Sequence, residues 1–117
     1  MKNDLMIGDW VYNTNNNQPE RVYEIGSGLV MLSYNDLYEY DEIRPIPLTA
    51  EILEQNGFEL LRDTWYFSQN GRPVLIRFAD NYIVIIINGD HVPMKLRYVH
   101  ELQHAMRLCG IDKEIIM

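Results

Sequence analysis

The sequence is poor in cysteine and has no long apolar run. Cys109 is its single cysteine, so the chain has neither an internal disulfide nor a multi-cysteine metal site. The longest apolar run, residues 82–87, is far shorter than the roughly 20 residues that a membrane-spanning helix needs. The N-terminus lacks the long apolar stretch and the small-residue cleavage site of a secretory signal. These absences predict a cytoplasmic protein with no membrane segment.

Basic residues are also few. Ten Lys and Arg against seventeen Asp and Glu give a formal net charge of −7, and the basic residues form no stripe. Because nucleic-acid binding depends largely on Lys and Arg that neutralise phosphates, a nucleic-acid partner is disfavoured. The densest acidic stretch, residues 39–42, has two interpretations. It is either ordinary solvated surface or part of a surface that mimics DNA and inhibits a nucleic-acid enzyme.

Two kinds of catalytic loop are missing as well. The sequence has no glycine-rich loop of the type that binds phosphates, so it gives no support to nucleotide hydrolysis. Ser27 lies between Gly26 and Gly28, but a nucleophile elbow separates its serine from each glycine by one residue. This segment is therefore expected to be a turn.

The first 47 residues predict an antiparallel β unit, either a meander or a small barrel. Short segments rich in Val, Ile and Tyr alternate with turn-forming residues. Because proline lacks a backbone donor, Pro45 and Pro47 are expected to close this unit. The expected strands cover residues 10–12, 21–25, 29–33 and 37–40, and residues 13–19 are expected to form an exposed loop.

Residues 48–117 predict an α-β-β-β-α unit. Thr49 is a helix N-cap, Leu48 and Leu53 occupy the positions of a hydrophobic staple, and Gly57 ends this short helix. The expected strands cover residues 64–69, 74–79 and 82–87, with a type I′ turn at residues 70–71 and an edge strand at residues 91–94. A second helix over residues 97–109 ends at Gly110. The predicted fold class is α+β, with units at 1–47 and 48–117 that share one core.

Four segments together resemble a known group of sequences. They are Ile7-Gly8-Asp9-Trp10-Val11-Tyr12, Ile46-Pro47-Leu48-Thr49, Gly57-Phe58 and Tyr98-Val99-His100-Glu101-Leu102-Gln103. In order and spacing they resemble small proteins without a known activity that occur in Bacteroidetes bacteria, their prophages and their mobile elements. The resemblance implies a bacterial cytoplasmic setting and an accessory role on a mobile element. The group often has Gln at the position of Glu101 and Asn at the position of His104.

One motif points to metal chemistry. His100, Glu101 and His104 match the H-E-x-x-H pattern, in which two histidines one helical turn apart bind zinc and the glutamate activates a water molecule. A catalytic zinc site needs a third protein ligand, and His91 is the only other histidine. The alternative function is therefore a small zinc-dependent hydrolase with ligands His91, His100 and His104 and with Glu101 as base.

The orientation of the second helix argues against that alternative. At about 100° per residue its apolar side chains, Cys109 among them, gather on one side and the two histidines of the motif on the other. Arg97 and Arg107 flank the histidines, and their positive charge disfavours a divalent cation. We therefore expect His100 and His104 to face solvent, Cys109 to lie in the core, and the motif to be a chance match.

Tyrosines and acidic residues cluster in the first unit. Tyrosines at positions 12, 23, 34, 38 and 40 lie near Glu39 and Asp41, and such rings either form a cage for a cation or belong to an ordinary half-buried sheet. The sequence predicts a non-enzymatic cytoplasmic interaction module with a protein partner and no cofactor. An acidic DNA-mimicking inhibitor is a second alternative. The predicted partner-binding residues are Tyr12, Tyr23, Tyr38, Glu39, Tyr40 and Asp41.

Overall fold

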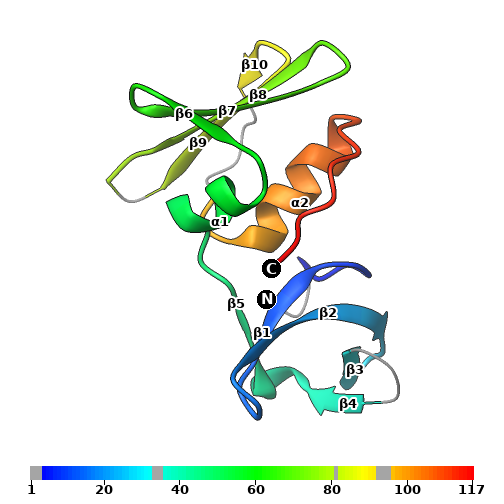
Figure 1. Ribbon diagram of the computed structural model, residues 1–117. Coiled ribbons are helices and arrows are strands. Elements are labelled where there is room, and N and C mark those ends of the chain that lie inside the picture. Colours follow the sequence, from blue (N-terminus) through cyan, green and yellow to red (C-terminus); the bar gives the residue numbers. More distant parts are fainter. Residues whose placement is uncertain (1–3, 33–35, 81, 92–95) are drawn as a thin grey trace. The chain divides into compact units, whose positions relative to one another are not determined.

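The computed structural model describes residues 4–32, 36–80, 82–91 and 96–117. The chain divides into two compact units, Met1–Pro47 and Leu48–Met117. In the described ranges it forms two α-helices and ten strands, and the strands make two five-stranded antiparallel sheets (Figure 1). The predicted α+β class is confirmed.

The sheet of the first unit has the order β4-β3-β2-β1-β5. Its first four strands form the predicted meander, and β5 returns to pair with β1 at the other edge. Strand β5 was not predicted because it contains Pro45, but an edge strand tolerates proline since it needs backbone donors on one side only. The strands are β1 Trp10–Asn13, β2 Gln18–Ile25, β3 Leu29–Leu32, β4 Asp36–Glu39 and β5 Ile43–Pro45.

The predicted loop over residues 13–19 was too long. Asn13 is a buried residue of β1, and β2 already begins at Gln18. Burial of this polar side chain is possible because its Oδ1 accepts from the Asn15 amide at 2.9 Å and its Nδ2 donates to Glu20 Oε2 at 2.6 Å. The predicted strand at 37–40 was displaced by one residue, since β4 covers Asp36–Glu39 and Tyr40 begins the 3-10 helix Tyr40–Glu42. Ser33 and Tyr34 lie outside the described residues.

The core of the first unit lies on one face of its sheet. Along β3, Val30 and Leu32 are fully buried, whereas Leu29 and Met31 alternate with them and point to the opposite face. In β2 the register shifts between Val22 and Glu24, so the strand carries a bulge there. The core consists of Leu5, Val11, Val22, Val30, Leu32 and Ile43, and Tyr38 and Tyr40 pack against it.

The sheet of the second unit has the order β10-β9-β8-β7-β6. The three predicted central strands are confirmed, and one strand was missed at the edge next to β7. That strand, β6, lacks the alternation of buried and exposed residues that marks a strand, because all three of its residues are exposed. The predicted edge strand at 91–94 is present only as the short β10, and residues 92–95 lie outside the described ranges. The strands are β6 Glu59–Leu61, β7 Thr64–Gln69, β8 Arg72–Phe78, β9 Ile83–Ile87 and β10 Asp90–His91.

Strand β9 is covered on one face only, although its sequence, within the apolar run at residues 82–87, is apolar on both faces. Its residues alternate between buried Ile83, Ile85 and Ile87 and half-buried Val84 and Ile86. An apolar run marks a strand, but it does not distinguish two covered faces from one.

Local signals placed the turns correctly. Asn70 and Gly71, which join β7 to β8, have φ of 53° and 76°, as the predicted type I′ turn requires. Asn88 and Gly89 join β9 to β10 with the same combination, φ of 54° and 87°. Positive φ at both central residues matches the right-handed twist of the strands that such turns connect.

The two helices begin and end close to the predicted residues. Helix α1, Ala50–Gln55, starts after Thr49, whose hydroxyl accepts from the Ile52 amide at 3.3 Å. It ends at Gly57 with φ of 85°, and the Phe58 amide donates back to the Leu53 carbonyl at 3.0 Å. Helix α2, Val99–Leu108, is slightly shorter than the predicted span of 97–109.

The last seven residues are held in place without regular secondary structure. Asn56 donates from Nδ2 to the Ile116 carbonyl at 2.9 Å and accepts at Oδ1 from the Ile116 amide at 2.7 Å. The Asp112 amide donates to Gln69 Oε1 at 2.8 Å, and Ile111 and Ile115 are buried. No helix in the described ranges is long and apolar enough to cross a membrane.

Candidate functional site

Glu101 of the H-E-x-x-H motif is engaged by the backbone at the start of α2. Its Oε1 accepts from the Arg97 amide at 2.9 Å and from the Tyr98 amide at 3.0 Å. Amides that precede the first helical turn need acceptors from outside the helix, and a glutamate at the third helical position reaches back to supply one. Glu101 therefore caps its own helix.

The expectation that His100 and His104 face solvent was wrong. His100 is 1% exposed, and His104 is half-buried. The His100 ring stacks on that of Tyr98 at 5.9 Å between centroids and meets the edge of the His104 ring at 5.6 Å. The buried part of α2 is wider than its apolar stripe, since it comprises Val99, His100, Leu102, Gln103, Ala105 and Met106.

The proposed zinc ligands do not form a ligand set in the described structure. His91 lies exposed on β10. Among the described residues, no group of three or more His, Cys, Asp or Glu side chains is placed to hold a metal ion. Arg97, predicted to flank the motif, has its Cζ 5.6 Å from the centre of the Tyr98 ring.

The expectation that Cys109 lies in the core was also wrong, because its side chain is exposed. It occupies the C-cap of α2, where the chain leaves the helix and the helical angle no longer fixes the direction of the side chain.

The predicted partner-binding residues of the first unit have different environments. Tyr38 and Tyr40 pack against the core, and the Tyr40 hydroxyl donates to the Gly26 carbonyl at 2.6 Å. Tyr12 is half-buried and alternates with core residue Val11, which puts it on the other face of the sheet. This division favours half-buried sheet residues over a single aromatic cage. Exposed positions remain at Tyr23, Glu39 and Asp41.

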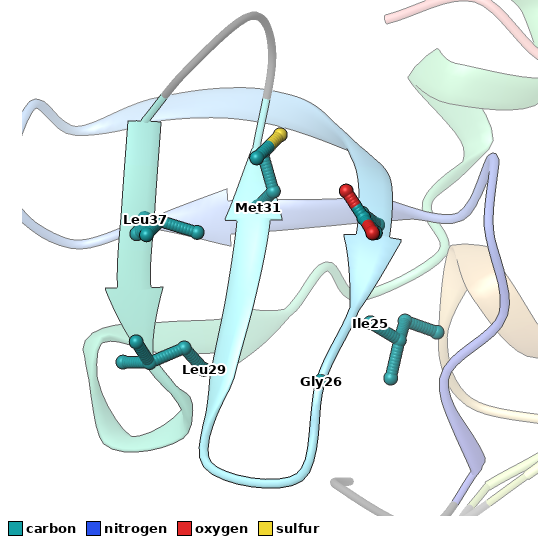
Figure 2. Close-up of a pocket in the computed structure, with 6 residues that line it drawn as sticks. Ile25, Gly26, Leu29, Met31 and Leu37 are labelled. Carbon is teal, nitrogen blue, oxygen red and sulfur yellow. The ribbon is translucent and has the colours of Figure 1, made fainter.

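A hollow with apolar walls, which was not predicted from the sequence, lies on the outer face of β2, β3 and β4. Figure 2 shows the side chains of Leu37 and Met31 side by side on neighbouring strands, with Leu29 beside the turn that contains Gly26. The register places Glu24 opposite Met31, and Met31 opposite Leu37. The hollow, of about 200 Å³, is lined by Glu24, Ile25, Gly26, Leu29, Met31 and Leu37.

Three apolar side chains of this hollow are exposed. Leu37 is 59% exposed, Leu29 42% and Ile25 37%. The sequence contains a signal for this hollow. Leu29, Met31 and Leu37 alternate with the inward-facing Val30 and Tyr38, so the strands are apolar on both faces although only one face is covered.

Negative charge is concentrated in the first unit. Residues 1–47 contain three Lys or Arg and eight Asp or Glu, a net charge of −5, whereas residues 48–117 contain seven and nine, a net charge of −2. Hydrogen bonds from the Asn15 side chain and from the Glu39 amide, the latter at 2.8 Å, lower the pKa of Glu42 below its usual value. Glu42 therefore keeps its negative charge at neutral pH.

No family model, no curated protein and no solved structure matches the sequence. A function is therefore inferred from the burial, contacts and charges of the side chains described above.

Proposed function

We propose that this protein is a non-enzymatic interaction module that binds a protein partner through its first unit. It acts in the cytoplasm, as an accessory protein of a Bacteroidetes prophage or mobile element. The observation that carries the proposal is the combination, in one small unit, of a net charge of −5 with exposed apolar side chains on the outer face of β3 and β4. Exposed apolar residues with a polar rim are typical of protein-binding surfaces.

The state of the H-E-x-x-H motif supports this proposal over a zinc hydrolase. A general base must reach a water molecule on the metal, but the Glu101 carboxylate accepts two backbone hydrogen bonds. His100 is buried between the rings of Tyr98 and His104. These contacts give the motif a structural role at the start of α2.

A quantitative pull-down from the cells that make the protein tests the proposal. The test variant combines Tyr23→Ala, Glu39→Gln and Asp41→Asn, all at exposed positions of the first unit. The matched control combines Tyr82→Ala, Glu59→Gln and Asp63→Asn, which make the same changes at exposed positions of the second unit.

The proposal predicts a specific protein that the wild type and the control retain and that the test variant loses. Equal recovery of every protein by the test variant and the control would contradict it. Recovery of a basic nucleic-acid enzyme, with binding that salt abolishes, would instead favour a DNA-mimicking inhibitor.

A further inference from the structure

We propose that the hollow lined by Glu24, Ile25, Gly26, Leu29, Met31 and Leu37 is a docking site for a basic protein segment that inserts one large apolar side chain. This inference rests on the proposed function and adds the chemistry of the partner. It is supported by the exposed apolar side chains, by the size of the hollow and the bonds that hold its walls, and by the charge around it.

The apolar side chains at the hollow have a free-energy cost while they face water. Leu29 and Leu37 come from neighbouring strands and face the same side of the sheet, because each alternates with a residue that packs inward. Covering apolar surface is favourable in proportion to the area that is removed from water. A partner that covers these residues therefore gains binding free energy where the unit now exposes apolar surface.

The size of the hollow limits what can enter it. A dry apolar cavity of about 150 Å³ already holds a benzene molecule. A hollow of about 200 Å³ thus has room for one aromatic or long aliphatic side chain. Single buried anchors of this kind dominate many protein interfaces.

The walls of the hollow are held by bonds within the first unit. The turn after β2 is closed by a hydrogen bond of 2.9 Å from the Gly26 amide to the Leu29 carbonyl. The Tyr40 hydroxyl donates to the Gly26 carbonyl of the same turn at 2.6 Å. The site therefore exists before a partner arrives, which lowers the cost of binding.

Charge determines which partner fits. Glu24 lines the hollow on β2, and Glu39 follows Leu37 on the same face of β4. Together with the net charge of −5 on the first unit, these carboxylates attract Lys or Arg next to the inserted side chain. The net charge of −7 disfavours a second copy of this chain, nucleic acids and anionic membranes as the occupant.

Nuclear magnetic resonance titrations of the full chain with three short peptides test this proposal. In the first peptide lysine alternates with phenylalanine, in the second serine replaces the phenylalanine, and in the third glutamate replaces the lysine. We expect saturable shifts at Glu24, Leu29, Met31 and Leu37 with the first peptide alone. Leu37→Ser should weaken its binding by about tenfold, as expected for loss of a central apolar contact.

The matched control is Leu61→Ser, because Leu61 is 55% exposed on β6 in the second unit. It should leave the affinity unchanged, and both variants should keep the wild-type spectrum elsewhere. Glu24→Gln should weaken binding and reduce its salt dependence.

Three results would overturn the proposal: no binding of the first peptide, equal binding of the glutamate peptide, or shifts that concentration alone produces through self-association. A protein captured in the pull-down but unaffected by Leu37→Ser would overturn this site while leaving the proposed function intact.

Discussion

The residues of the H-E-x-x-H motif show that, in the described part of the chain, a sequence motif can be present without the metal site that it predicts. The spacing of His100, Glu101 and His104 fits a zinc site, yet the Glu101 carboxylate binds the amides of Arg97 and Tyr98. The capping role of Glu101 could have been predicted from the sequence, since a glutamate at the third helical position is a common cap. The burial of His100 could not be predicted in this way, because it depends on the elements that pack around α2, and helical periodicity contains no information about them.

Replacing Glu101 tests its role as a cap. Glu101→Ala should lower the free energy of unfolding by about 1 kcal/mol, the usual cost of losing a helix cap. Glu101→Gln should cost less, because an amide oxygen still accepts from the backbone. Urea denaturation measures both values, with Glu54→Ala at an exposed position of α1 as the control. An effect of Glu101→Ala no larger than that of the control would show that the cap contributes nothing.

Glu42 makes a second prediction at this scale. Its folded-state pKa is lowered, first by the Asn15 side chain and then by the Glu39 amide. Its contribution to stability is therefore complete above the unfolded-state value of 4.5 and is lost as the pH falls through the lower folded-state value. Unfolding measured from neutral pH down into this acidic range should show a weaker pH dependence for Glu42→Gln and for Asn15→Ala than for the wild type. An unchanged pH profile in both variants would contradict the assignment.

At the scale of helices and strands, local sequence signals correctly predicted the helix ends and hairpin turns, which depend on neighbouring residues. Thr49, Gly57 and Gly110 mark helix ends, and Asn70-Gly71 marks a hairpin, because each residue satisfies a backbone requirement within a few positions. Strand β6 and the C-terminal segment escaped prediction for the opposite reason. Residues of β6 are all exposed, and the C-terminal segment is fixed by side chains as far away in sequence as Asn56.

The C-terminal segment gives the prediction for this scale. Asn56→Ala removes two bonds to Ile116 and one of 2.8 Å to the Ile52 carbonyl. At roughly 1 kcal/mol per hydrogen bond, it should lower the free energy of unfolding by about 2–3 kcal/mol. Hydrogen exchange at the Ile116 amide should also become faster. Gln55→Ala, at the exposed neighbouring position, is the control. Unchanged exchange at Ile116 would mean that other contacts hold the segment.

For the whole molecule, the distribution of charge carries the functional argument. The composition gives a net charge of −7, but a net charge does not show on which part of the molecule the charges lie. When the chain is divided after Pro47, the first unit has a net charge of −5 and the second a net charge of −2. The hollow on β2, β3 and β4 lies in the first unit, and the proposed partner chemistry rests on these two observations together.

Photocrosslinking in the cells that make the protein tests this account most directly. A photoreactive residue at position 37 lies at the hollow, and one at position 61 lies at an equally exposed leucine of the second unit. The account predicts a discrete crosslink to a basic protein from position 37 that Glu24→Lys suppresses, and none to that protein from position 61. The same crosslinked proteins from both positions, or no crosslinked protein from position 37, would contradict it.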